Sequence, residues 1–200
     1  DSVEPLGAQT VDSLAFKDLR FRMVGPFRGG RSSAVTGFPG DADRWLMGTT
    51  GGGVWETTDN GASWQNISDA FFGGSIGAVK VAESDPNVIY VGQGSADIRG
   101  NTSTGRGMWK SMDAGRTWTF IGLPEAGQIG RIEVHPDDHN LVYVAALGHP
   151  FGKNPERGIF RSKDGGETWQ HLLALNDSTG ASDLTMDMVN PRILYAGMWR

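Results

Sequence analysis

The sequence repeats one short pattern three times at an interval of about fifty residues. The pattern is Ser/Thr-x-Asp-x-Gly-x-Ser/Thr-Trp, and its aspartates are Asp59, Asp113 and Asp164, which lie 54 and 51 positions apart. A fixed interval of this size is typical of repeat architectures, in which each repeat is one supersecondary unit. We therefore expect the chain to fold as an array of similar units.

Each repeat also contains a short apolar strand, a proline turn, a second apolar strand and a hairpin whose turn carries the aspartate pattern. The proline turns lie at Pro39, Pro86, Pro136 and Pro191. Proline has no amide to donate to a sheet, so each one marks the end of a strand. The 30 glycines are about twice the usual share and indicate many tight turns, while no stretch has a helical period. The predicted fold is an all-β propeller of four-stranded antiparallel blades, with about 3.5 blades present.

The repeat interval divides the chain into units. We expect residues 1–30 to form an N-terminal arm and entry loop, and residues 31–200 to form a partial propeller. Closed propellers have typically 4–8 blades. The remaining blades are therefore expected to come from a longer chain of which this segment is a part. The expected repeat units are 31–75, 76–128, 129–180 and an incomplete unit 181–200.

The aspartate pattern has the composition of a tight turn. An aspartate can accept backbone amide hydrogen bonds across a turn, glycine adopts positive φ at no steric cost, and tryptophan can pack the turn onto the blade. We favour this structural role over a catalytic or calcium-binding one, because each blade keeps its aspartate far from the others. The residues assigned to it are Thr57, Asp59, Gly61, Trp64, Ser111, Asp113, Gly115, Trp118, Ser162, Asp164, Gly166 and Trp169.

Composition excludes several classes of partner. The formal net charge is −5 with both signs interspersed, so no nucleic-acid partner is expected. No apolar run approaches the roughly 20 residues of a membrane span. The absence of cysteine excludes disulfides and thiolate metal sites. Since His149 has no second histidine near it in the sequence, we predict neither a metal nor a cofactor.

Strand alternation sorts the loops onto two faces. Turns after the first and third strands of a blade share one face, here called the bottom face, and the other connections share the top face. The aspartate and proline turns fall on the bottom face, while two long connections, 95–106 and 148–157, fall on the top face. Such loops often carry ligand sites, although a purely solvated role stays open. Together with the arginine-rich entry loop they contain the ligand-binding candidates Arg28, Arg31, Asp97, Arg99, Arg106, His149, Lys153 and Arg157.

The aspartate patterns resemble the Asp-box, also called the bacterial neuraminidase (BNR) repeat, which lies between the third and fourth strands of propeller blades. With their surroundings, GPFRGGR, TTGGGVWETTDNGASW and HPDDHNLVYVAALG, they are most similar to the N-terminal propeller part of large secreted bacterial proteins of the sortilin-like type, often named glycosyl hydrolases. The resemblance implies an extracytoplasmic location: secreted, periplasmic or associated with the outer membrane. It does not define an activity, because Asp-box propellers serve as receptors, assembly factors and glycosidases.

Catalytic residues of the related glycosidases do not carry over. In the oligoxyloglucan-type enzymes an early blade bears Thr-Asp-x-Gly-Gly with a catalytic aspartate, and the matching stretch here is TTGGG at residues 49–53, with Thr50 in place of the acid. A threonine cannot act as a general acid or base at neutral pH. We assign no catalytic residue and favour a non-catalytic or structural part that binds a glycan, a peptide or an anionic partner on its top face. The alternative is part of a sialidase- or xyloglucanase-like glycoside hydrolase whose catalytic acids lie mostly outside this segment.

Overall fold

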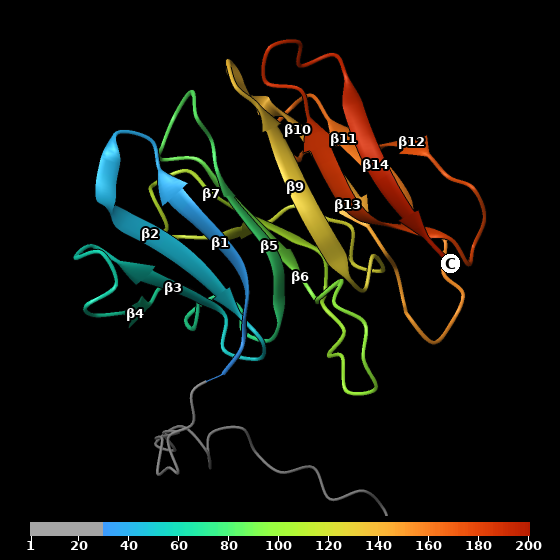
Figure 1. The fold of residues 1–200 in the computed structure, drawn as a ribbon, viewed down its shortest axis with the longest axis horizontal. Helices are drawn as coiled ribbons and strands as arrows, with labels where there is room; N and C mark the ends of the chain where they lie inside the picture. The colour runs from blue at the N-terminus through green and yellow to red at the C-terminus, as the bar shows by residue number, and fades with distance from the viewer. Residues whose placement is uncertain (1–29) are drawn as a thin grey trace, which may run out of the picture.

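The computed structural model describes residues 30–200, which form strands and turns with no helix among them (Figure 1). The predicted all-β class is confirmed. The strands in chain order are β1 (Ser32–Phe38), β2 (Asp41–Thr49), β3 (Val54–Thr57), β4 (Gln65–Asn66), β5 (Ile76–Val81), β6 (Ile89–Gln93), β7 (Met108–Ser111), β8 (Thr119–Phe120), β9 (Ile129–His135), β10 (Asp138–Ala146), β11 (Gly158–Ser162), β12 (Gln170–Leu173), β13 (Gly180–Met186) and β14 (Leu194–Trp199).

The strands form three four-stranded sheets and one two-stranded sheet. Strands β1 to β4, β5 to β8 and β9 to β12 each pair in chain order, and β13 pairs with β14. All the pairs are antiparallel, so each sheet is a simple meander of the kind that forms a propeller blade. The described residues thus contain about 3.5 blades, as predicted.

The blades stand side by side, with the first strand of each lying along one inner edge (Figure 1). Strand β1 contacts β5, β5 contacts β9, and β9 contacts β13. Each of these strands has an irregularity near its start, where a residue such as Gly77 or Gly130 meets the backbone of the next blade. A Cβ at Gly77 would overlap the carbonyl oxygen of Ile129, and only glycine avoids this contact.

The apolar core lies between neighbouring blades. Leu46 and Val54 of the first blade pack with Ile76, Val79 and other residues of the second blade in one buried cluster. A second cluster joins the second and third blades, and a third joins the third blade to β13 and β14. Burial of apolar side chains is therefore shared between repeats, which is how repeat proteins obtain a continuous core.

The apolar residues within 184–188 predict the first strand of the last unit, but β13 begins earlier, at Gly180, and ends at Met186. Hydrophobicity alone missed its start, because Gly180 and Ala181 are small residues that are buried through tertiary packing. The fourth strands β4 and β8 have only two residues each.

Candidate functional site

Each aspartate turn, at residues 57–64, 111–118 and 162–169, is closed by the same set of hydrogen bonds. In the second turn the Asp113 carboxylate accepts bonds from the backbone amide and the hydroxyl of Thr117, at 2.8 and 2.6 Å. The Ser111 hydroxyl donates to Asp113 at 2.8 Å and accepts the Gly115 amide at 2.8 Å. Gly115 has φ of 90°, a conformation that glycine adopts without steric cost.

These hydrogen bonds stabilise the ionised carboxylates. The hydroxyl and amide of Ser63, with the Thr57 hydroxyl, lower the pKa of Asp59 to about 2. The equivalent bonds from Thr117 lower the pKa of Asp113 to about 2, and the bonds from Thr168 lower the pKa of Asp164 further. A carboxylate held in this state is a turn component and a poor proton donor at neutral pH.

The tryptophans of the second and third turns contact the preceding blade, whereas we expected them to pack on their own blade. The Trp118 indole nitrogen donates to the carbonyl oxygen of Ile67 at 3.0 Å. The Trp169 indole nitrogen donates in the same way to Ile121 at 2.6 Å. The turns therefore connect blades, a role that sequence spacing within one repeat cannot reveal.

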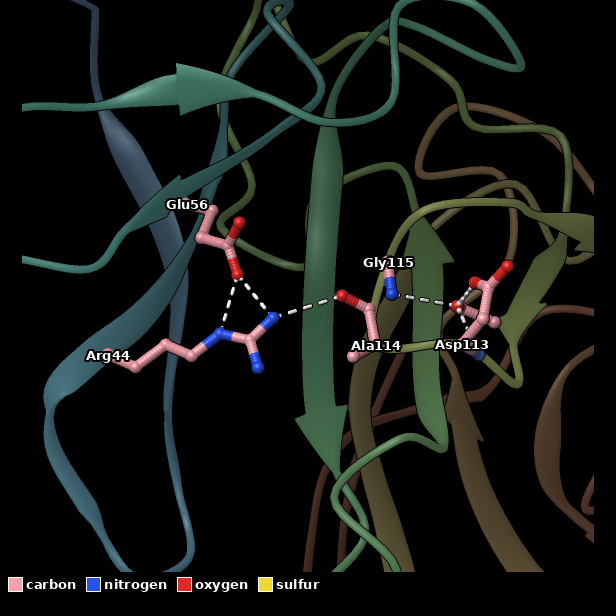
Figure 2. A network of polar contacts seen from close by, with 6 residues as sticks. Arg44, Glu56, Asp113, Ala114 and Gly115 are labelled. Atoms are coloured by element: carbon pink, nitrogen blue, oxygen red, sulfur yellow. Dashed lines mark hydrogen bonds and ion pairs between the residues drawn. The ribbon is translucent and has the colours of Figure 1, made fainter.

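An arginine that was not singled out in the sequence adds a second connection between the first two blades. The Arg44 guanidinium pairs with Glu56 at 2.6 Å and donates to the carbonyl oxygen of Ala114 at 3.1 Å (Figure 2). It also lies 3.8 Å from the centre of the Phe38 ring. Arg44 thus links strand β2 to the aspartate turn of the next blade, where Figure 2 shows Asp113 and Gly115 beside Ala114.

The top-face connections are hydrogen-bonded to one another. The Thr50 amide donates to the carbonyl of Arg31 at 2.9 Å, Gly94 to Ser75 at 2.7 Å, and Gly105 to Gly127 at 2.6 Å. These bonds hold in place the connections that carry Arg31, Asp97, Arg99 and Arg106. Among the predicted ligand-binding residues, Arg28 lies outside the described part of the chain. Exposed positions are Arg31, Asp97, Arg106 and Lys153, half-buried positions are Arg99 and His149, and Arg157 is buried.

Arg157 stabilises the 148–157 loop in which it lies. Its guanidinium donates to the carbonyl oxygen of Leu147 at 2.8 Å and to those of His149 and Gly152. Burial lowers the pKa of Arg157, and the side chain is 3% exposed. The guanidinium therefore shapes the 148–157 loop and is not presented to solvent. Of the charged side chains on this loop, Lys153 is exposed and pairs with Asp177 at 3.3 Å.

A cavity of about 370 Å³ opens on the top face between the first and second blades. Arg106 is the predicted ligand-binding residue that the structure places in it. The other lining residues were not predicted from the sequence. They come from the connection between β4 and β5 and from β6, β7 and the loop between them: Phe71, Phe72, Gly73, Gly74, Ser75, Gln93, Thr104 and Trp109. In the sequence, the consecutive Phe71 and Phe72 beside two glycines were the feature that could have indicated this cavity.

A second cavity of about 360 Å³ lies along the inner edge, over strands β1, β5 and β9. Its charged lining residues are Lys80 and Arg131. Both pair with the buried Glu133, at 3.6 and 3.2 Å. This ion-pair network lies on the inner-edge strands β5 and β9. Within residues 30–200, no three His, Cys, Asp or Glu side chains are grouped as a metal site.

Thr50 lies in the connection between β2 and β3 of the first blade. Its amide is bonded to Arg31, and its hydroxyl has no hydrogen-bond partner among residues 30–200. The neighbouring Thr49 hydroxyl donates to the carbonyl of Gly53 at 3.0 Å. The structure thus shows a tight glycine-rich turn at the position where the resemblance placed an acid.

Known proteins with a similar sequence fall into two groups. A vacuolar protein sorting/targeting protein 10 from Pyricularia oryzae is 34% identical over 92 residues, which is 44% of this chain and 6% of that protein. A xyloglucanase from Hypocrea jecorina is 28% identical over 138 residues, 65% of this chain and 14% of the enzyme. The chain therefore spans only a small part of the length of these relatives.

Solved structures with a similar fold include enzymes and a peptide-bound protein. An ancestral GH74 enzyme matches with a TM-score of 0.66 and 21% identity, over 84% of this chain and 22% of that chain. A YCF48 protein bound to D1 peptide matches with a TM-score of 0.52 and 17% identity, over 79% and 45% of the two chains. At these identities the matches support the propeller fold alone.

A family model covers the centre of the chain. Residues 52–184 match the Sortilin-Vps10 model, described as sortilin, neurotensin receptor 3. This range contains the second and third blades, the last strands of the first, and most of β13. Residues 30–200 contain no helical stretch with the length and hydropathy that a membrane crossing requires. Since the match covers more than half of the sequence, the chain belongs to the Sortilin-Vps10 family.

Proposed function

We propose that this chain is a non-catalytic or structural part of an extracytoplasmic propeller that binds a glycan, a peptide or an anionic partner on its top face. The observation that carries the proposal is the placement of Arg31, Arg99 and Arg106 on connections whose backbones are hydrogen-bonded to neighbouring connections. Guanidinium groups form strong, directional bonds to carboxylates, because the bonds are charge-assisted and the planar fork of donors matches the two carboxylate oxygens.

The relatives support a binding role. Proteins named for vacuolar protein sorting and targeting are similar in sequence to parts of this chain, and a protein of similar fold is bound to a peptide. A ligand on the top face of this chain would agree with both. The extracytoplasmic location is part of the same proposal. The bacterial source expected from the resemblance stays a prediction, since the relatives compared above by sequence are fungal.

The arrangement of acidic side chains supports a non-catalytic role. Asp59, Asp113 and Asp164 are engaged in their turns, and Thr50 stands at the position of the expected acid. Glycoside hydrolysis usually requires a pair of carboxyl groups on either side of the scissile bond. Glu133, the buried acid on the inner edge, is paired with two cations and lies on a strand away from the top-face loops.

A second candidate function is part of a glycoside hydrolase. The 28% identity to a xyloglucanase over 65% of the chain favours it. In this case the catalytic acids would come mostly from outside the segment, and these blades would hold the substrate. The 200-residue chain should then bind xyloglucan without releasing reducing ends from it. Release of reducing ends by the chain alone would contradict the non-catalytic assignment.

Array binding tests the proposed function. The chain is applied to a glycan array and to a peptide array, together with Arg31→Gln, Arg99→Gln and Arg106→Gln. We expect at least one of these variants to lose most of the signal of the bound ligands. Arg192→Gln is the matched control, because Arg192 is an exposed arginine beside Pro191 on the bottom face. An unchanged signal in all three top-face variants, or binding to nothing on either array, would overturn the proposal.

A further inference from the structure

The cavity between the first and second blades has a rigid floor. Phe72 stacks on Trp109 with ring centres 4.7 Å apart and meets Trp118 edge to face at 5.5 Å. The Trp109 indole nitrogen donates to the Gln93 side-chain oxygen at 3.2 Å, and the Gln93 amide group donates to the carbonyl of Gly73 at 2.6 Å. The floor is therefore formed before any ligand arrives, which lowers the entropic cost of binding.

Ser75 lines this cavity with a polar group that the protein leaves unused. The residue is 2% exposed, and its hydroxyl has no hydrogen-bond partner among the described residues. Buried hydroxyls are nearly always bonded, because the loss of water is otherwise uncompensated. The same residue's carbonyl accepts the Gly94 amide at 2.7 Å, so the backbone that carries the hydroxyl is held in place. A ligand with its own hydroxyl or carbonyl groups would complete this site.

The rim of the cavity combines an apolar surface with a positive charge. Phe71 is 40% exposed and lies at the edge of the cavity. Arg106 is exposed, and no hydrogen bond or ion pair occupies its guanidinium within residues 30–200. Its backbone amide donates to the Gln93 side-chain oxygen at 3.3 Å, which anchors the arginine beside the floor. Thr104 adds a hydroxyl to the same rim.

From these groups we infer that the cavity binds one acidic sugar residue of a glycan, a hexuronate, and this inference rests on the proposed top-face binding function. The carboxylate of the sugar pairs with Arg106, and the C–H face of its ring packs on the aromatic groups Phe71 and Trp109. Its ring hydroxyls exchange hydrogen bonds with Ser75 and Thr104. An acidic peptide would also pair with Arg106, and its carbonyl groups could accept from Ser75, but an acidic side chain presents no ring face to pack on Phe71 and Trp109.

The inference is tested by titration calorimetry of the chain with tri-galacturonate, with cellotriose as the neutral sugar and tri-glutamate as the acidic peptide. We expect tri-galacturonate to bind and the other two to bind at least tenfold more weakly. Arg106→Gln should weaken tri-galacturonate binding roughly tenfold to a hundredfold, because it removes a charge-assisted bond. Phe71→Ala should weaken it about tenfold, while Phe151→Ala, at an exposed phenylalanine on another top-face loop, should not.

Ser75→Ala separates a binding role from a structural one. The substitution removes a hydroxyl with no partner in the protein, so the melting temperature should stay the same or rise. Tri-galacturonate affinity should nevertheless fall roughly threefold to tenfold, the value of one neutral hydrogen bond. Arg192→Gln, on the bottom face, should leave both quantities unchanged.

The outcomes distinguish this inference from the proposed function. If tri-galacturonate binds with the same affinity to Arg106→Gln and Ser75→Ala, the ligand sits elsewhere and the cavity assignment is wrong, while top-face binding survives. Tighter binding of tri-glutamate, lost in Arg106→Gln, would overturn the sugar assignment in favour of an acidic peptide. Absence of binding to all three probes would overturn the hexuronate inference, and the arrays would still decide the proposed function separately.

Discussion

The indole nitrogen of Trp118 donates a hydrogen bond to the carbonyl oxygen of Ile67 at 3.0 Å, although the two residues are 51 positions apart and lie in different blades. Trp169 and Ile121 repeat the relationship between the next two blades, at 2.6 Å. Each aspartate turn after the first thus closes its own hairpin and also fastens that hairpin to the blade before it. In a repeat protein such nearest-neighbour contacts supply the stability that single repeats lack.

Trp118→Phe should destabilise the chain by about 1–2 kcal/mol. The substitution keeps most of the buried ring area but leaves the Ile67 carbonyl without its donor. Trp64→Phe is the matched control, because Trp64 is 36% exposed and its indole nitrogen has no partner within residues 30–200. Its effect should stay below about 0.5 kcal/mol. Urea unfolding followed by circular dichroism measures both, and equal losses would contradict the role of the bond between blades.

Gly166→Ala should cost more than Gly61→Ala, although both glycines have positive φ, of 99° and 91°. In both variants an alanine with positive φ destabilises the folded backbone by about 1–2 kcal/mol. A Cβ at Gly166 would also lie 2.5 Å from the Ile121 side chain of the preceding blade, whereas at Gly61 the nearest side-chain atom is 3.9 Å away. Overpacking should add about 1–3 kcal/mol. Ile121→Val should relieve part of that excess in a double-mutant cycle, and no coupling would contradict the steric account.

Acidification should destabilise the chain through the aspartate turns. The folded-state pKa of Asp59 and Asp113 is about 2, below the ordinary value of 3.8. A depressed carboxyl pKa contributes stability above the unfolded value, and this contribution is lost as pH falls from about 4 to about 2. Thermal unfolding midpoints between pH 6 and pH 2 should show this decline. Asp113→Asn should be less stable at pH 6 and should lose less on acidification, so an identical decline would exclude the turn as its origin.

Arg157→Lys should loosen the 148–157 loop without unfolding the blades. The buried guanidinium bonds to the carbonyls of Leu147, His149 and Gly152, and an ammonium group cannot reproduce this planar arrangement of donors. Hydrogen exchange of the loop amides should become at least tenfold faster, while exchange in β10 should stay within about twofold. Lys153→Arg on the same loop is the control, because Lys153 is exposed. Unchanged loop exchange in Arg157→Lys would contradict the structural role.

Much of the candidate site could not be read from the sequence. Arg106 was predicted because it lies on a long, charged connection, and that signal is local. Ser75, Gln93 and Trp109 come from different connections and strands, and their common cavity exists only after two blades have packed together. Arg157 also lies on a long, charged connection and was predicted to bind a ligand for the same reason. It is buried, however, and it stabilises its own loop.

What the sequence by itself determined is the repeated blade: the interval of the aspartates, the proline turns and the alternation of apolar strands all act within about fifty residues. Turn hydrogen bonds such as Thr117 to Asp113 span four positions, so they too are visible in the pattern. Only the tertiary structure decided which residues of the preceding blade each turn contacts and which loops meet. The Trp118 to Ile67 bond and the cavity around Ser75 join different repeats. Those contacts form only where residues of two repeats meet, so the pattern within one repeat cannot specify them.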